Sequence, residues 1–179
     1  MIISDASIAS NAELIKFTKI THIINLSTKK VDNFFAEKQR DKEIVKKLFS
    51  ESEDSEYNDL IGKVKYFSVD DWNESNIKLT FDLCQELYMF IEKAVRTKSI
   101  CLVISLKNYC STVAVACAYL IFKHKWSSQS ALEYIKGIKV DVNMTPGILT
   151  QLTKIETHFL QMIRISNKRL TLRSNWRIT

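Results

Sequence analysis

The stretch Val103-Ile104-Ser105-Leu106-Lys107-Asn108-Tyr109-Cys110-Ser111-Thr112 decides how this chain is interpreted. A short apolar run, Ile100 to Val103, precedes it, and a nearly all-apolar run, Val113 to Lys123, follows it. A continuous apolar run indicates a strand covered on both faces, and the longer run indicates a buried helix. The stretch is therefore predicted to be the loop of a strand-loop-helix unit.

Strands and helices alternate along the rest of the chain. The apolar, β-rich runs predict strands at 21–26, 64–69 and 100–105. Three- and four-residue apolar spacing and cap residues predict helices at 12–17 (capped by Ser10 or Asn11), 31–49, 79–95, 113–123, from Ser127 or Ser128 to Ile138, and from Pro146 to about Arg164. This alternation predicts an α/β fold with a central, mostly parallel sheet flanked by helices.

Several further segments share an order and spacing with one known family. They are Ile8-Ala9-Ser10-Asn11-Ala12-Glu13-Leu14, Ile20-Thr21-His22-Ile23-Ile24-Asn25-Leu26-Ser27, Tyr66-Phe67-Ser68-Val69-Asp70-Asp71-Trp72, Ala131-Leu132-Glu133-Tyr134-Ile135-Lys136 and Pro146-Gly147-Ile148-Leu149-Thr150-Gln151-Leu152. With the loop, they make the chain resemble the dual-specificity phosphatases over roughly residues 5–160. The resemblance implies the cysteine-dependent phosphatase fold.

The same resemblance implies that the active-site loop is degenerate. The family's loop reads His-Cys-x5-Arg-Ser/Thr. By position, Ile104 replaces the His, Ser105 the nucleophilic Cys, Asn108 a Gly and Ser111 the Arg, while Thr112 keeps a compatible type and Asp71 stands at the general-acid position.

Phosphatase chemistry of this class needs groups that the chain lacks. A thiolate attacks phosphorus, an Arg holds the phosphoryl oxygens bidentately, and a carboxylic acid protonates the leaving oxygen. A hydroxyl at Ser105 is a weak nucleophile without an adjacent base, and neighbouring Ile104 supplies none. Ser111 removes the fixed cation. The sequence therefore predicts that the protein is not an enzyme.

Some positions leave alternatives open. Asp71 is either a vestigial general acid or an acid in an exposed turn, and the second interpretation is preferred. Asn108 tolerates positive φ, so the loop could still close. Cys110 could be an exposed thiol at a helix start with some reactivity, although a passive side chain is preferred.

Composition is ordinary for a globular domain: 46% hydrophobic and 26% charged residues, with three Gly and one Pro. No apolar run approaches the roughly 20 residues that span a membrane, and the N-terminus does not resemble a signal peptide. The four cysteines have no paired spacing and are interpreted as reduced core thiols of an intracellular, cytoplasmic protein. The three His residues form no metal-ligand pattern, so no metal or other cofactor is expected.

The predicted domain organisation is a phosphatase-like domain at 1–163 and a basic C-terminal tail at 164–179. Family members usually connect the corresponding strands with fewer residues, so 31–59 is interpreted as an insertion. It contains an acidic cluster from Glu51 to Asp59.

The tail concentrates the positive charge of the chain, whose net charge is +6. From His158 to Thr179 there are five basic residues and no acid. The tail is either a solvated extension or a contact element in which apolar anchors and cations meet an acidic protein surface. The residues proposed for that contact are Lys168, Arg169, Leu170, Leu172, Arg173, Trp176 and Arg177.

Three functions remain in competition at this point. The preferred one is an inactive phosphatase-like domain that acts by protein-protein contact, as an interaction or structural module. A microtubule would fit as its acidic partner, which would give a cytoskeletal or ciliary location; RNA is a less favoured partner, and no membrane or small-molecule substrate is expected. The alternatives are a residual phosphoprotein-binding domain that shields phosphosites, and an enzyme with unrecognised chemistry.

Overall fold

The computed structural model describes residues 1–5, 8–27, 64–69, 72, 77–105, 109–138, 142 and 144–175. Two compact units are distinguished. The first unit comprises Met1–Ile77 and Met89–Thr112, and the second comprises Lys78–Tyr88 and Val113–Thr179. The predicted helix at 31–49 and the insertion at 31–59 lie outside the described residues, and the proposed boundary at residue 163 stays a prediction.

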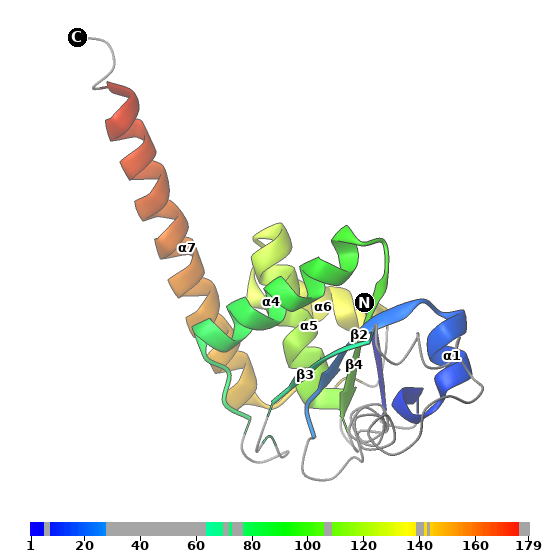
Figure 1. The fold of residues 1–179 in the computed structure, drawn as a ribbon. Helices are drawn as coiled ribbons and strands as arrows, with labels where there is room; N and C mark the ends of the chain where they lie inside the picture. The colour runs from blue at the N-terminus through cyan, green and yellow to red at the C-terminus, as the bar shows by residue number, and fades with distance from the viewer. Residues whose placement is uncertain are drawn as a thin grey trace. The chain divides into compact units, whose positions relative to one another are not determined.

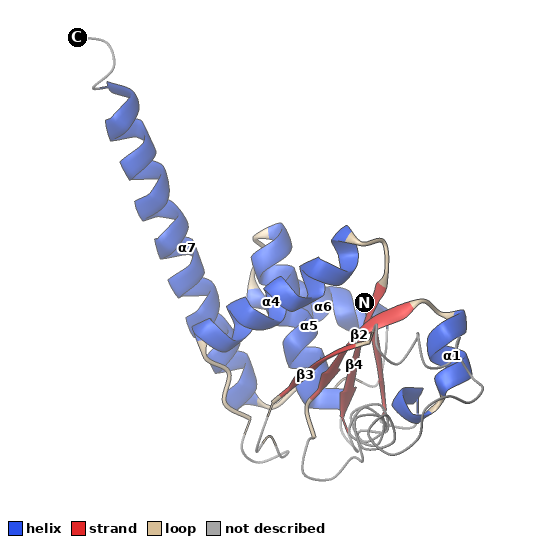
Figure 2. Cartoon of the chain, in the orientation of Figure 1, coloured by secondary structure: helices blue, strands red, loops and turns tan. Residues whose placement is uncertain are grey.

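A four-stranded parallel sheet organises the first unit (Figure 1, Figure 2). Its strands are β1 (Ile2–Asp5), β2 (Ile20–Asn25), β3 (Lys65–Ser68) and β4 (Ile100–Ser105), in the order β1-β4-β2-β3. Every pairing is parallel: β4 pairs with β1 and β2, and β2 pairs with β3. The two inner strands, β2 and β4, are the most apolar and most buried, as a sheet covered on both faces requires. The predicted α/β fold with a parallel sheet is confirmed.

One cluster of buried apolar side chains packs η1 (Ile8–Ser10) and α1 (Ala12–Phe17) against this sheet. Its buried members are Ala9, Ile15, Ile20, Ile23, Val64, Leu102 and Ile104. They come from the 3-10 turn η1, from α1, from β2 and β4 and from Val64, the residue before β3. Asn11 caps α1, because its Oδ1 accepts the Leu14 N–H at 3.0 Å. One of the two proposed caps of this helix is thereby confirmed.

Two lysines in the left-handed region turn the chain into β2 and β4. Lys19 follows α1 with φ 57°, and Lys98 follows α4 (Phe81–Arg96) with φ 53°. Behind α4, the Ser99 N–H donates to the Ala94 carbonyl and the Lys98 N–H to the Val95 carbonyl, each at 3.0 Å. This is the Schellman pattern, which satisfies the last carbonyls of a helix. The Ile100 N–H then donates to the Lys19 carbonyl at 3.1 Å, so the two turns are joined where β4 begins.

The second unit contains most of α5 (Tyr109–His124) together with α6 (Ser128–Ile138) and α7 (Pro146–Asn175). Phe122 is at its centre: its ring lies 4.6 Å from that of Phe159, 5.4 Å from that of Phe81 and 5.7 Å from that of Tyr88, centroid to centroid. These aromatic contacts tie α5 to α7 and to the first turns of α4.

Hydrogen bonds at the start of α6 fix its position on α7. Ser127 caps α6 by accepting the Ser130 N–H at 3.1 Å. The Glu156 carboxylate of α7 accepts the Ser128 N–H at 2.8 Å, which places a negative charge at the N-terminus of α6. The first half of α7 is therefore held by packing and by hydrogen bonds.

The structure differs from the predicted elements mainly in one strand and two helix boundaries. β1 was not predicted, because four residues at the start of a chain carry little periodic signal. α5 begins at Tyr109 rather than Val113. α7 continues to Asn175 rather than ending near Arg164, so residues 164–175 have a helical backbone. Val113 to Ala118 are all buried, as predicted for the helix behind the loop.

Candidate functional site

The carboxyl ends of parallel strands meet at one edge of a sheet, and this edge carries the candidate site. β4 ends at Ser105, and α5 begins at Tyr109. Asp5 of β1 pairs with Ser105, and Asn25 of β2 pairs with Ile104. The structure thus has β4 followed by α5, as predicted from the sequence, at the edge where a sheet of this type places its ligand site.

Ile104 and Ser105 close β4 and are both buried, with 1% and 6% of their surface exposed. The Ile104 carbonyl accepts the Leu26 N–H at 3.0 Å, and its side chain belongs to the apolar cluster of the first unit. At the position where the family has a His, this chain therefore has a core residue. Ile104 contributes burial to the fold and has no group that can accept a proton.

Ser111 and Thr112 lie in the first turn of α5, because that helix begins four residues earlier than the sequence suggested. Both are buried, Ser111 with 9% and Thr112 with 0% of its surface exposed. The Thr112 hydroxyl donates to the Tyr109 carbonyl at 2.9 Å. The hydroxyl of the one compatible loop position is thus bonded to the backbone of its own helix.

Two predicted site residues, Asn108 and Asp71, lie outside the described residues. The segment leading to Asp71 does begin at the same sheet edge, since the Val69 N–H donates to the Asn25 carbonyl at 3.0 Å. The roles assigned to Asn108 and Asp71 stay predictions.

Asn25 is a site residue that the sequence reasoning missed. It is 1% exposed at the carboxyl end of β2, and its Oδ1 accepts the Ser27 N–H at 2.9 Å. Its side chain holds the turn beside the β4 exit. A single buried amide at the end of an apolar strand was the available signal, because a buried polar group must find a partner.

The cysteines are all free and buried, so the prediction of reduced core thiols is confirmed. Only 4% of the Cys110 surface is exposed, which contradicts the less favoured alternative of an exposed thiol and agrees with the preferred interpretation of a passive side chain. Burial raises the pKa of the Cys84 and Cys101 thiols to about 12, which leaves these two protonated and unreactive at neutral pH.

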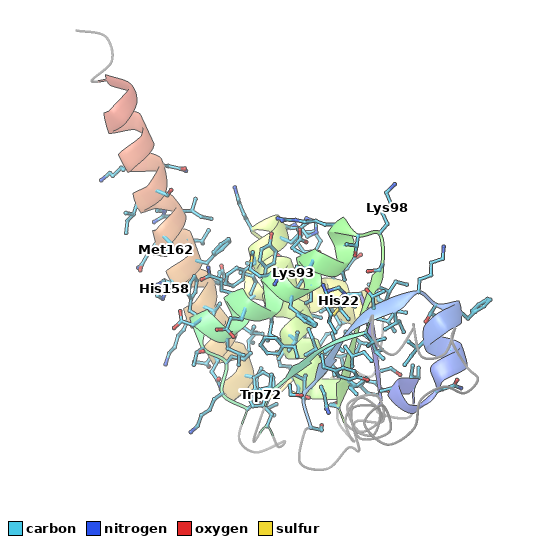
Figure 3. The ribbon with its side chains drawn as sticks, viewed as in Figure 1. His22, Trp72, Lys93, Lys98, His158 and Met162 are labelled. Carbon is cyan, nitrogen blue, oxygen red and sulfur yellow. The ribbon has the colours of Figure 1, made fainter. Side chains whose placement is uncertain are left out.

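His22 of β2 is a buried histidine whose pKa is shifted by its surroundings (Figure 3). It is 3% exposed, its Nδ1 lies 2.8 Å from the Thr21 hydroxyl, and its ring contacts Phe90 edge-on at 4.9 Å. Nε2 is buried without a hydrogen-bond partner among the described residues. Burial, and then the charges of Lys65 and Lys93, lower the pKa of His22 below its usual value of 6.5. The imidazole is therefore neutral in the folded protein at neutral pH.

This lowered pKa predicts a loss of stability in mild acid. The unfolded chain takes up a proton at His22 near pH 6.5, while the folded chain resists it, so stability is complete above about pH 6.5 and falls as pH drops below that value. His22→Phe keeps a ring beside Phe90 and should reduce this pH dependence. Urea unfolding at pH 7.5 and 5.5 measures it, with His124→Phe, at an exposed position, as the control. An unchanged pH dependence in His22→Phe would refute the assignment.

Within the described ranges, no group of three or more His, Cys, Asp or Glu side chains could hold a metal ion. A search of the same residues finds no helix with the length and apolarity to cross a membrane.

The tail residues are placed in part. Lys168 is exposed on α7. The backbone of Arg169, Leu170, Leu172 and Arg173 is helical, and Trp176 and Arg177 lie outside the described residues. Their role as contacts stays a prediction.

Comparisons with known proteins give one consistent result. No family model matches the chain. It is 28% identical over 92 residues to dual specificity protein phosphatase 1B of Arabidopsis thaliana, a match that spans 51% of this chain and only about half, 53%, of that protein.

Solved structures extend the likeness to nearly the whole chain. The structure of human DUSP28 superposes with a TM-score of 0.64 and 19% identity, covering 90% of this chain and 94% of that one. The human tyrosine phosphatase-like serine/threonine/tyrosine-interacting protein superposes with a TM-score of 0.62 and 16% identity, covering 88% and 91%. The chain thus resembles a dual-specificity phosphatase in sequence over about half of its length and shares the fold of such proteins over nearly all of it, which confirms the resemblance drawn from its sequence.

Proposed function

We propose that this chain is a catalytically inactive phosphatase-like domain that acts by binding other proteins. The observation that carries the proposal is the pair Ser105 and Ser111, at the end of β4 and in the first turn of α5. The strand-loop-helix unit is kept, while the positions that hold the thiol and the guanidinium in the family both hold hydroxyls.

Neither hydroxyl replaces what is missing. A serine hydroxyl needs a base to become a nucleophile, and the adjacent side chain is an apolar core residue. A guanidinium supplies five donors and a permanent charge in a planar fork, none of which a hydroxyl can reproduce. Transition-state charge on the phosphoryl oxygens would therefore have no fixed cation opposite it.

The second support for the proposal is α7. Helix α7 carries Arg164 and Lys168 on exposed positions, and the sequence from His158 to the end has five cations and no acid. Packing of α7 within the second unit does not require this excess of positive charge. The partner we propose is a protein with an acidic surface, in a cytoskeletal or other large assembly; a microtubule meets this description. The human structure named a phosphatase-like interacting protein offers an analogy for such a role on the same fold.

Truncation tests the contact role of α7. A chain ending after Ser166 should melt at nearly the same temperature as the full chain, because Ile148, Leu152 and Ile155, the buried residues of α7, all remain. It should lose the assembly that co-purifies with the full chain. Thermal melting and quantitative co-purification measure the two effects. A truncated chain that unfolds would make the segment structural, and one that retains its assembly would make it a passive extension.

A phosphoprotein-binding domain is the second candidate, favoured by the retained helix start at the loop, where backbone N–H groups can meet an anion. We expect it to fail, because Ser111 supplies no charge. Titrating phosphotyrosine and phosphothreonine peptides against their unphosphorylated forms decides between the two. Affinities that agree within about twofold support the contact function, whereas a phosphate-dependent gain of tenfold, about 1.4 kcal/mol, would favour the reader.

A further inference from the structure

The second half of α7 is a helical extension with exposed apolar side chains, as found in helices that bind another helix. α7 has 30 residues, which makes it about 45 Å long. Its ring contacts end at Phe159, whose ring stacks on Phe122, and His158, whose ring stacks on Phe81 at 4.3 Å. Ile163 is still partly buried, and Arg164 to Lys168 are all exposed. Beyond this point α7 extends past the other helices of the second unit (Figure 1).

Two large apolar side chains are exposed on this extension. Met162 is 51% and Ile165 is 52% exposed (Met162 is labelled in Figure 3). They are three residues apart, so they lie on the same face of the helix. In the sequence the spacing continues to Arg169 and Leu172, both within α7. Positions 162, 165, 169 and 172 thus follow the alternating three- and four-residue spacing of a coiled-coil seam.

The charges beside this seam decide what can cover it. Lys168 is exposed three residues after Ile165, and Arg164 is exposed one turn before Lys168, so both cations lie on one side of the seam. The sequence from 158 to 175 contains no acid. A second copy of the extension would bring cations against cations. A lipid surface would require a larger apolar face than the pair Met162 and Ile165 provides. An acidic helix satisfies both features, because its apolar stripe covers Met162 and Ile165 while its carboxylates meet the cations.

We propose that the seam of α7 at Met162 and Ile165, flanked by Arg164 and Lys168, binds an acidic amphipathic helix of a partner protein. This rests on the proposed function, since it specifies the partner of the contact element. A helix with few tertiary contacts is marginal in water, and the partner would add the missing apolar contacts. The apolar pair anchors the partner, and the cations select its charge and speed its encounter.

The probe for this inference is a synthetic four-heptad peptide with Leu at the a and d positions and Glu at the flanking e and g positions. Two matched peptides accompany it: one has Ser in place of each Leu, and the other has Lys in place of each Glu. The full chain should bind the first peptide, with an affinity that falls as salt rises, and should bind the other two at least tenfold more weakly. Fluorescence anisotropy with a labelled peptide measures this.

Variants of the chain locate the contact. Met162→Ser with Ile165→Ser should weaken binding at least tenfold, and Arg164→Glu with Lys168→Glu should do the same. Tyr134→Ser with Ile138→Ser, which removes two exposed apolar side chains of α6, should change it less than twofold. All replaced side chains are exposed, so circular dichroism should show unchanged folding.

Three results would overturn the inference: equal binding of the Ser-substituted peptide, undiminished binding by both α7 variants, or association of the chain with itself in place of peptide binding. Assays of aryl phosphate hydrolysis on the same preparations keep the two proposals separate. An active chain that binds the peptide contradicts the proposed function alone, and an inactive chain that does not bind contradicts the inference alone.

Discussion

Phe122→Ala is expected to lower the free energy of unfolding by about 3–5 kcal/mol, the usual cost of deleting a buried aromatic ring. Phe122 is 7% exposed and contacts the rings of Phe81, Tyr88 and Phe159. Its removal would leave a cavity among α4, α5 and α7 inside the second unit. Urea unfolding followed by circular dichroism measures the change.

Three further variants serve as controls for the stability loss expected of Phe122→Ala. Phe122→Leu, which keeps much of the volume, should cost less than Phe122→Ala. Phe17→Ala, at an aromatic position that is 86% exposed, should change stability by no more than about 0.5 kcal/mol. Ser105→Ala, at the former nucleophile position, should cost about 1 kcal/mol or less, the net value of one hydrogen bond. If Ser105→Ala were more costly than Phe122→Ala, the division into a retained scaffold and a vestigial loop would be wrong.

Restoring the nucleophile should not restore catalysis. Ser105→Cys is expected to hydrolyse p-nitrophenyl phosphate no faster than the unmodified chain, because position 111 still lacks the guanidinium. In a serine protease, loss of the nucleophile alone costs on the order of 10^6 in turnover. Only Ser105→Cys combined with Ser111→Arg should give a trace of turnover. An active single Cys variant would contradict this account of the loop.

The surroundings of position 105 add a physical reason. Burial raises the pKa of the Cys101 thiol, on the same strand, to about 12. Position 105 is also buried, so a thiol there would be desolvated in the same way unless the start of α5 offsets the effect. Ile104 cannot assist, because its side chain is in the core. A thiol-reactivity assay of Ser105→Cys against pH would report the resulting pKa.

The sequence predicted the parts of the fold in which burial leaves a periodic signal. β4 was placed at 100–105 with its observed bounds, because an inner parallel strand reads as one uninterrupted apolar run. The start of α5 was missed because Tyr109 to Thr112 are weak helix formers and the family resemblance assigned them to a loop. The end of α7 was missed for a different reason: Arg164 to Lys168 are all exposed, so burial no longer imposes a helical apolar pattern there.

The sequence predicted where the candidate site lies in the fold, but not the contacts that its residues make. Ser105 ends β4, as the strand-loop-helix pattern predicted, whereas Ser111 lies in the first turn of α5 rather than in the loop. The burial of Ile104 in the core, the hydrogen bond of Thr112 to Tyr109 and the turn held by Asn25 depend on partners distant in sequence or on exact helix bounds. Such contacts are properties of the folded chain, and the residue types alone do not specify them.

The most direct test of the central proposal compares the unmodified chain with Ser105→Ala in one assay. Both are incubated with p-nitrophenyl phosphate at high enzyme concentration, beside a buffer blank and an active dual-specificity phosphatase as the positive control. Our account predicts that both proteins match the blank while the positive control turns over. Turnover by the unmodified chain that Ser105→Ala abolishes would show that Ser105 is a working nucleophile and would contradict the account.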